Sequence, residues 1–554
     1  MKKERLDISG NEKMKMMNKK KFEFWLDNWA RKVAEREKKL KRGLKIFRTE
    51  SGLGASGVPH IGSFGDVLRQ YGVTLALQDM GLKSELIAFC DDRDGLRKVP
   101  LGFPDWLEDY IGKPVTDIPD PFKCHKSFGG HMSSMLIESL EKVGIKFRLM
   151  SGYEIYKTGI LNEQIEKILL QSALAGEIIK KILGQEKFTE MLPYLPTCEN
   201  CGKIYTTRSY EVLPKEHKVM YACDLEFLGK NRNNGKDILV KGCGHKGETS
   251  YFNANGKLAW KVEFAARWCA LGIVFEAHGK DILDSVRVND EICRRILNWE
   301  PPLHFVYEMF LDKGGKKISK SIGNVLSPQI WFRYATPESL ILLMLRRSEG
   351  TRKINVTDIP TYMDDVDRLE DIYFGLKEEK NPRDLFNAKR LFEFVHLLKT
   401  PKKISLHIPY NTVIEIAKIL PEEKQVEFAL EKLKEFGYVK KIDSSVKNEL
   451  EKRLEFAKNW EGDFLKAEVI EIKVSEIEKK AIKQLIETIE TEKDGEKLQY
   501  KIFEIAKTCG IKPVKFFQLI YRIIFNQDKG PRLGPYMIER GKKEIIELLE
   551  KSLE

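Results

Sequence analysis

The chain has 554 residues, of which 42% are hydrophobic and 32% are charged, and its formal net charge is +12. These proportions exclude a disordered or fibrous chain and indicate a globular protein of several domains. No stretch approaches the ~20 apolar residues of a membrane span, and the basic opening segment lacks the apolar core of a secretory signal. Nine cysteines are too few for a disulfide scaffold, so we expect a cytoplasmic protein with reduced thiols and no membrane partner.

The first part of the chain predicts a parallel α/β unit. In chain order, the pattern predicts an amphipathic helix at 22–42, a strand at 44–48 and a glycine-rich turn at 51–57. A helix at 66–81 and a buried strand at 84–90 follow. This order is the βαβ unit of a doubly wound sheet, in which ligands bind at the carboxyl ends of the strands. The segment "SGLGASGVPHIGS" (51–63) and the pair Asp91 and Asp92 would therefore lie at a ligand site.

Further along, the pattern of predicted helices and strands changes. Residues 165–183 predict a helix within an insertion that also carries a turn-rich patch with cysteines. Strand and helix patterns return at 257–310. Beyond 336 the chain becomes helical, with charged amphipathic segments such as 425–437. We expect an α/β domain interrupted by an insertion and followed by helices.

Two short segments carry the chemistry. "GGKKISKSIGN" (314–324) places three lysines and two serines behind two glycines. Such a loop is most often a solvated basic surface. Alternatively, glycine hinges and the point charges of Lys317 and Lys320 would form a mobile phosphate clamp. "PHIGS" (59–63) is poor core material and is better suited to a ligand cradle at a turn.

Together, HIGS (60–63) and KISKS (317–321) resemble the HIGH and KMSKS pair of class I aminoacyl-tRNA synthetases. In that family, the first motif binds ATP phosphates at a helix N-terminus, and the lysines of the second stabilise the triphosphate during attack on the α-phosphate. The resemblance implies the catalytic residues His60, Lys317 and Lys320. It also implies the ATP-binding residues Pro59, His60, Gly62, Ser63, Gly279, Lys280, Asp281, Lys317, Ser319 and Lys320.

Longer segments narrow the resemblance to class I lysyl-tRNA synthetases, a form found mainly in archaea and some bacteria. The similar segments cover nearly the whole chain and lie at 91–100, 110–128, 278–281 and 516–537. The resemblance implies ATP-dependent activation of L-lysine to lysyl-adenylate, transfer to tRNA-Lys, Mg²⁺ accompanying the ATP, and a monomeric enzyme.

The same resemblance implies a lysine pocket. Its residues would be Gly52, Gly54, Asp91, Asp92, Trp260 and Tyr307. Aromatic faces suit an aliphatic stem and attract an ammonium group, whereas without the resemblance Trp260 and Tyr307 would be taken as core.

Three positions depart from the family pattern. Ser63 replaces the second histidine of HIGH, Gly54 replaces a common threonine, and Ile282 replaces the histidine of "GKDH". A hydroxyl at 63 can bond a phosphate but cannot carry positive charge. His278 lies close enough in sequence to Ile282 to be considered as compensation.

Four cysteines suggest a structural metal site. Cys198 and Cys201 form a C-x₂-C pair, and Cys223 and Cys243 flank two strand-like runs around Asn234–Gly235, a favoured hairpin turn. Folding that hairpin brings the second pair together, which predicts a four-cysteine zinc site, with His245 as the alternative fourth ligand. The competing interpretation is scattered buried cysteines.

The resemblance implies five regions. An N-terminal helical extension at 1–43 precedes a Rossmann-like catalytic domain, whose two halves at 44–120 and 250–335 enclose a zinc-containing insertion at 121–249. A helical stem-contact region at 336–404 and a helical anticodon-binding domain at 405–554 follow. The fold class is thus α/β plus all-α. Three alternatives stay open: a related synthetase for another amino acid such as glutamate, a catalytically inactive tRNA-binding relative, and a nucleotidyltransferase, which would leave the long helical C-terminus unexplained.

Overall fold

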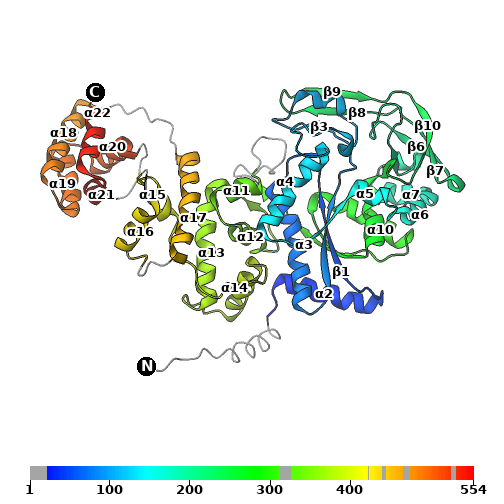
Figure 1. Cartoon of the computed structure of the whole chain (residues 1–554), viewed down its shortest axis with the longest axis horizontal. Helices are drawn as coiled ribbons and strands as arrows, with labels where there is room; N and C mark the ends of the chain where they lie inside the picture. Colours follow the sequence, from blue (N-terminus) through cyan, green and yellow to red (C-terminus); the bar gives the residue numbers. More distant parts are fainter. Residues whose placement is uncertain are drawn as a thin grey trace. The chain divides into compact units, whose positions relative to one another are not determined.

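The computed structural model describes residues 22–308, 310–311, 326–421, 423–439, 444–465, 474–525 and 532–553. The chain divides into two compact units, Met1–Ser405 and Leu406–Glu554 (Figure 1). Among the helices in the described ranges, none combines the length and apolar character needed to cross a membrane.

A parallel five-stranded sheet forms the centre of the first unit (Figure 1). Its strands in spatial order are β13 (Leu303–Tyr307), β12 (Ile273–Gly279), β1 (Phe47–Leu53), β2 (Ser84–Cys90) and β4 (Arg148–Ser151). The chain starts in the middle, moves to one edge and returns beside β1 on the other side. This order confirms the predicted Rossmann-like, doubly wound core.

Helices lie on both faces of this sheet, as the alternating side chains of β1 show. Thr49 contacts Thr74 of α3 (Ile61–Asp79) through hydroxyl oxygens 2.7 Å apart. The next residue, Glu50, pairs with Arg267 of α9 (Trp260–Leu271). Since successive strand residues face opposite sides, α3 and α9 cover opposite faces.

The predicted elements of the first part occur with shifted ends. The leader helix is α2 (Trp25–Leu40), and β1 continues into the glycine-rich segment because Ser51, Gly52 and Leu53 pair in register with β2. Helix α3 begins before the predicted start, directly after His60. The segment 165–183 forms two helices, α6 (Asn162–Leu170) and α7 (Ser172–Leu183), because the backbone of Gln171 leaves the helical region.

The predicted boundary between catalytic domain and insertion at residue 121 comes too early. Strand β4 lies within 121–249 yet pairs with β2 as the edge of the central sheet. Helix α4 (Phe128–Val143) precedes it and packs on α3 and α11 (Pro328–Tyr334). The first half of the sheet domain therefore extends to Ser151.

The rest of the insertion is built from short helices and small sheets. The predicted hairpin exists: β8 (Glu226–Asn231) and β9 (Asp237–Lys241) pair antiparallel, and Gly235 adopts φ 73° in the turn. The remaining elements before β12 are β3 (Lys98–Val99), α5 (Gly152–Lys157), α8 (Lys187–Glu190), β5 (Tyr194–Pro196), β6 (Arg208–Leu213), β7 (Lys218–Ala222), β10 (Lys246–Ser250) and β11 (Gly256–Leu258).

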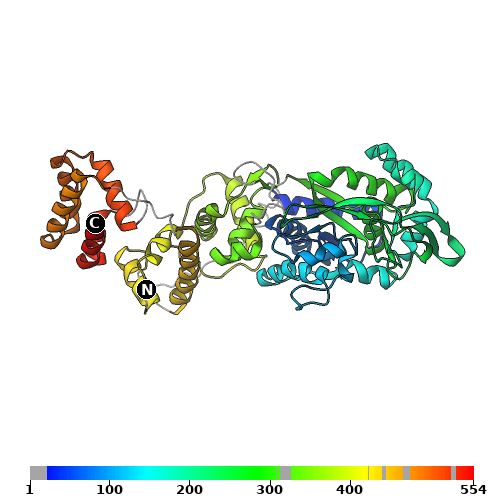
Figure 2. The same ribbon diagram turned by 90° about the horizontal axis from the view of Figure 1, so that it is seen from above.

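After β13 the first unit is mostly helical, apart from the short strands β14 (Phe310–Leu311) and β15 (Arg352–Lys353), and the described part of the second unit is helical throughout (Figure 2). The helices that follow β12 in the first unit are α10 (Leu283–Arg295), α11, α12 (Pro337–Leu345), α13 (Ile359–Phe374) and α14 (Pro382–Val395). In the second unit they are α15 (Tyr410–Ala417), α16 (Gln425–Glu435), α17 (Ser444–Trp460), α18 (Glu476–Thr491), α19 (Gly495–Thr508), α20 (Pro513–Phe525), α21 (Leu533–Arg540) and α22 (Lys542–Lys551).

Candidate functional site

A cavity of about 300 Å³ opens at the carboxyl ends of β1 and β12, where the strand order reverses. This crevice is where doubly wound sheets bind their ligands. Predicted residues for ATP and for lysine share its lining, namely Gly52, Gly54, His60, Gly62, Ser63, Asp91, Gly279, Asp281 and Tyr307. The fold therefore brings both predicted sets around one space.

His60 forms the start of α3 at this cavity. Its Nδ1 accepts the backbone N–H of Ser63 at 3.2 Å, which caps the helix. Gly62 is needed because a Cβ there would lie 2.6 Å from Cε1 of the His60 ring. Since Nδ1 accepts, the proton of neutral His60 lies on Nε2, which is then a donor. A donor at a helix N-terminus is an arrangement that suits phosphate.

Tyr307 forms a fixed wall of the cavity at the end of β13. Its hydroxyl donates to the carboxylate of Asp66 on α3, and the guanidinium carbon of Arg69 lies 4.1 Å from its ring centroid. Burial and the neighbouring Asp66 raise the pKa of Tyr307. The side chain therefore stays a neutral donor near neutral pH.

The floor of the cavity is charged. Arg267 pairs with Glu50 at 2.7 Å and with Asp91 at 2.9 Å, and its own side chain is 1% exposed. Burial raises the pKa of Asp91 to about 7 even though Arg267 acts in the opposite direction. Burial likewise raises the pKa of Glu50. One guanidinium thus serves two carboxyl groups that are costly to ionise.

Two further side chains from β12 complete the floor. Glu276 is buried, accepts a hydrogen bond from the indole N–H of Trp268, and has a pKa raised by burial and by Glu50. His278 is also buried, with Nδ1 3.0 Å from the carbonyl oxygen of Gly279. Burial lowers the pKa of His278, so its ring is neutral at pH 7.

Four predicted residues do not line the cavity. Asp92 accepts the N–H of Tyr153 at 2.8 Å and so fixes the start of α5. Lys280 is exposed and pairs at 3.1 Å with Glu308, which itself lines the cavity. Trp260 lies at the first residue of α9 and is 39% exposed. Pro59 is buried behind the loop.

The cavity instead includes side chains that sequence reasoning missed, among them Asp66, Phe264, Arg267 and Glu276. Phe264 follows Trp260 by one turn of α9, and its ring centroid lies 6.0 Å from that of Trp260. Phe264 was overlooked because the resemblance implied Trp260 as the aromatic residue of the pocket. The charged residues would have been noticed as ionisable residues inside otherwise apolar helix and strand patterns.

Lys317, Ser319 and Lys320 lie outside the described residues. The next described residue is Leu326, whose carbonyl oxygen accepts the N–H of Ile61 at 2.9 Å. Leu326 therefore lies beside the first residue of α3, which follows His60 in the chain.

The four predicted cysteines converge in the insertion. All four sulfur atoms lie within 4.8 Å of one another, and the pairs Cys198–Cys243 and Cys201–Cys223 are each 3.7 Å apart. A tetrahedral Zn–S₄ centre with bonds of about 2.3 Å requires sulfur separations of about 3.8 Å. Burial opposes ionisation, yet hydrogen bonds from the Asn200 side chain and a backbone N–H lower the pKa of Cys243 to about 6.

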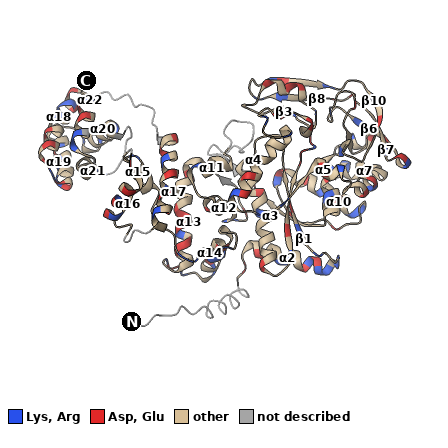
Figure 3. Cartoon of the chain, in the orientation of Figure 1, with Lys and Arg blue, Asp and Glu red and all other residues tan. Residues whose placement is uncertain are grey.

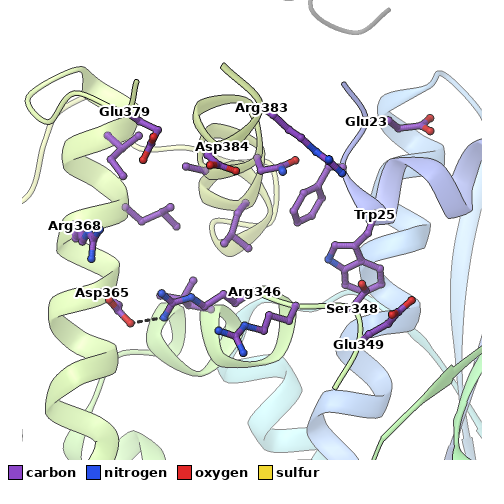
Figure 4. Close-up of a pocket in the computed structure, with 18 of the residues that line it drawn as sticks. Glu23, Trp25, Arg346, Ser348, Glu349, Asp365, Arg368, Glu379, Arg383 and Asp384 are labelled. Carbon is purple, nitrogen blue, oxygen red and sulfur yellow. Dashed lines mark hydrogen bonds and ion pairs between the residues drawn. The ribbon is translucent and has the colours of Figure 1, made fainter. Parts of the chain in front are cut away.

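A larger cavity of about 770 Å³ lies among α2, α12, α13 and α14 (Figure 4). Arginines and carboxylates both line it, and Arg346 pairs with Asp365 at 2.5 Å (Figure 4). None of the predicted site residues is among the described residues that line it. The mixture of charges does not single out an anionic or a cationic ligand.

Comparison with known proteins identifies the family of the chain. The family described as tRNA synthetases class I (K) matches residues 23–397. A lysine–tRNA ligase of Cenarchaeum symbiosum is 43% identical over 531 residues, which cover 96% of this chain and 98% of that protein. A lysine–tRNA ligase of Rickettsia bellii (strain OSU 85-389) is 30% identical over 543 residues, with 96% and 98% covered.

Among solved structures, a glutamate-tRNA synthetase from Elizabethkingia anophelis aligns over 92% of this chain and 99% of that chain, at 14% identity and a TM-score of 0.36. A likeness of this size bears neither on fold nor on substrate. The family match and the near full-length relatives do bear on identity, and the chain belongs to the class I tRNA synthetases of the lysyl type.

Proposed function

We propose that the protein is a lysine–tRNA ligase, which activates L-lysine with ATP and transfers the lysyl group to tRNA-Lys. Membership of the lysyl-type family and the full-length similarity to lysine–tRNA ligases support this function. The observation in the molecule itself that carries it is the balance of charge around the cavity.

The lining is rich in carboxyl groups and poor in cations. Arg267 is the only lysine or arginine among the described residues that line the cavity. The acidic residues are Asp66, Asp91, Glu276, Asp281 and Glu308. At about 4 Å, an ammonium and a carboxylate attract each other by about 4 kcal/mol in a partly buried site. The lining therefore favours a cationic amino acid.

The same geometry disfavours glutamate. A substrate carboxylate in such a site needs an available guanidinium, and Arg267 already holds Glu50 and Asp91. A substrate carboxylate buried beside Glu276 would also lose its hydration without gaining a cation, which costs free energy.

The ATP end of the cavity is formed by α3. The helix N-terminus and the Nε2 donor of His60 would hold the phosphates, and Gly62 leaves room for this capped geometry. Lys317 and Lys320 would neutralise the triphosphate as the lysine carboxylate attacks the α-phosphate and pyrophosphate leaves. Mg²⁺ would be brought in on the phosphate oxygens.

The lysine end would lie over Asp91 and Glu276. Their raised pKa values mean that an arriving ammonium group stabilises the ionised carboxylates and displaces their protons. Phe264 and Tyr307 offer flat apolar surfaces for the four-carbon stem. No covalent nucleophile from the protein is needed.

The four-cysteine cluster would hold zinc. The sulfur separations and donor set fit a structural Zn–S₄ centre, and four protein ligands leave no position for substrate. His245 would then not be required as a ligand. The metal would fix the C-x₂-C turn to the hairpin base.

The second unit, which begins at Leu406, would bind the tRNA anticodon, and the helices before it would contact the stem. Lysine and arginine residues are interspersed with acidic residues along its helices (Figure 3). Phosphate contacts from such exposed cations would supply affinity. We expect the enzyme to act as a monomer.

Lysine-dependent exchange between ATP and pyrophosphate tests the activation step, with tRNA present. We expect Lys320→Ala to lower the exchange rate about 100-fold, because it removes a preorganised charge at the reacting phosphate. Lys316→Ala, in the same segment, should change the rate by less than about threefold. Absence of exchange in the wild-type protein with any amino acid would overturn the proposal.

A further inference from the structure

A buried lysine lies next to the charged floor of the cavity without lining it. Lys257 is the middle residue of β11, and its side chain is 4% exposed. Its ammonium group pairs with the carboxylates of Asp94 and of Glu263, the second at 2.8 Å. Burial opposes the charged form, yet these two carboxylates raise the pKa of Lys257, so the side chain stays an ammonium ion.

The two partners of Lys257 belong to the two elements that form the floor. Asp94 follows Asp91 by three residues in the loop after β2, and its N–H donates to the carbonyl oxygen of Asp91 at 3.4 Å. Glu263 lies on α9 one turn before Arg267. Lys257 therefore connects the loop that carries Asp91 to the helix that carries Arg267.

Glu263 is fully satisfied in this arrangement. Its Oε1 accepts the hydroxyl of Tyr156 at 2.6 Å, and its Oε2 pairs with Lys257. Burial and Glu263 both raise the pKa of Tyr156, so the hydroxyl remains a donor. The same hydroxyl oxygen accepts the N–H of Leu258 at 2.9 Å. Glu263 thus needs nothing from Arg267.

Without Lys257, Glu263 would compete for Arg267. Glu263 is 2% exposed, so an unpaired carboxylate there would be costly. Residues four apart on a helix are neighbours on its surface, and the Nε of Arg267 has no hydrogen-bond partner among the described residues. A guanidinium drawn towards Glu263 would weaken its pair with Asp91.

Lys257 also acts on Asp91 through space. Burial raises the pKa of Asp91, and Arg267 lowers it. Lys257 lowers it as well, whereas Asp94 and Glu263 raise it. The charged groups near Asp91 come from its own loop (Asp94), β1 (Glu50), β11 (Lys257), α9 (Glu263 and Arg267) and β12 (Glu276). Of these groups, Arg267 and Lys257 are the cations.

We propose that Lys257 is a positioning residue for the recognition of a substrate ammonium group, an inference that rests on the proposed function. By holding Glu263, it leaves Arg267 paired with Asp91. By adding a positive charge beside the same loop, it favours the ionised carboxylate of Asp91 that an ammonium group needs. Lys257 itself does not line the cavity and acts through Asp91 and Arg267.

The KM for lysine in ATP–pyrophosphate exchange, measured against pH with tRNA present, tests this role. Lys257→Met should raise that KM about 10-fold at pH 8 and move the midpoint of its pH dependence about one unit higher. The KM for ATP and kcat should change by less than about threefold, because α3 keeps its N-terminus. Lys218→Met is the control, since its pair with Glu248 is exposed, and should leave the KM for lysine within about twofold.

A charge-balanced variant separates this role from simple packing. Lys257→Met combined with Glu263→Gln removes the cation and its buried partner together, and a glutamine can still accept the Tyr156 hydroxyl. Asp94 is 38% exposed and can be hydrated. We expect the KM for lysine to return to within about threefold of wild type. This result decides the matter even where the single variant does not fold, and a larger KM in the double variant would overturn the inference.

The wild-type protein provides the reference for both variants. Absence of lysine-dependent exchange in wild type would overturn the proposed function and this inference with it. Normal exchange in wild type, with an unchanged KM for lysine and an unchanged pH profile in Lys257→Met, would overturn the inference alone.

Discussion

The two units of the chain place their charged residues in opposite ways. In the first unit, Glu50, Glu263 and Arg267 are each no more than 2% exposed, and they lie at or beneath the cavity. In the second unit, Arg453 is the one charged or polar side chain that is buried among the described residues. Its core is aliphatic and aromatic, and its charged residues are spread along the helices (Figure 3).

This difference separates two uses of charge. Buried ions contribute little to stability and are retained where chemistry or specificity needs them, which under the proposed function would be the recognition of a small cationic substrate. Exposed charges leave stability unchanged but provide a surface for a polyanion, where attraction depends on salt. The following tests separate the two uses, from the largest expected effect to the smallest.

Salt should act on the second use alone. Raising the salt concentration from 50 to 200 mM is expected to raise the KM for tRNA by about 10²-fold or more, because phosphate contacts release counterions. The KM for lysine should change by less than about twofold, since the charges at the cavity are largely shielded from ions. Equal changes in the KM for tRNA and the KM for lysine would contradict the separation of buried charges for lysine and exposed charges for tRNA.

Removal of Arg267 should damage the first unit. Arg267→Met leaves Glu50 and Asp91 without their cation and is expected to lower the free energy of unfolding by about 3–5 kcal/mol. Arg208→Met is the matched control, because its pair with Asp224 is 2.8 Å long but more than a third exposed, and should cost less than about 1 kcal/mol. Urea unfolding followed by circular dichroism measures both. A similar loss of unfolding free energy in both variants would contradict a larger role in stability for the buried pairs of Arg267 than for the exposed pair of Arg208.

The pH dependence of lysine binding should follow Asp91. With a pKa of about 7, Asp91 holds a proton below that pH and cannot pair with an ammonium, so the KM for lysine should rise as pH falls from 8 to 6. Asp91→Asn should raise that KM about 10-fold at pH 8 and flatten the dependence. Asp284→Asn, at an exposed position, should leave the wild-type profile in place.

The same raised pKa of Asp91 has the opposite pH dependence for stability: low pH weakens lysine binding but favours the folded protein. Because the pKa of Asp91 is higher in the folded than in the unfolded chain, the folded protein binds the extra proton between about pH 4 and 7. The contribution of Asp91 to stability therefore decreases as pH rises through this window. Asp91→Asn should remove that decrease in the unfolding midpoint.

The smallest effect concerns the departure at position 63. Ser63→His would add a second imidazole near the start of α3, and a cationic donor there would attract the phosphates. The expected gain is about 0.3–1 kcal/mol, or about a two- to fivefold lower KM for ATP. A higher KM would mean that the ring competes with His60 for the capping position.

Sequence patterns predicted a parallel, doubly wound sheet, the hairpin and the convergence of the cysteines, because each depends on local signals with known geometry. The run "SELIAFC" is a buried strand in any parallel sheet, and Asn234–Gly235 fixes a hairpin. The ends of the glycine-rich turn could not be predicted, since Gly52 pairs with β2 only after the sheet has formed.

The floor of the site was less accessible to such reasoning. Arg267 and Glu50 come from opposite ends of the α/β domain in sequence and meet only because α9 crosses β1. The family resemblance implied that Asp92 and Trp260 lie in the pocket, whereas Asp92 caps α5 and Phe264 is the residue of α9 that lines the cavity beside Arg267. Long-range packing decides these roles.

The most direct test of the central claim is the specificity of tRNA-Lys charging among lysine, norleucine and glutamate. Norleucine keeps the four-carbon stem and lacks the ammonium group. We predict that kcat/KM for norleucine is at least about 10³-fold below that for lysine, because buried carboxylates would be left without a partner. We expect no measurable charging with glutamate. Charging of norleucine or glutamate as efficient as that of lysine would contradict an acidic, ammonium-selective cavity.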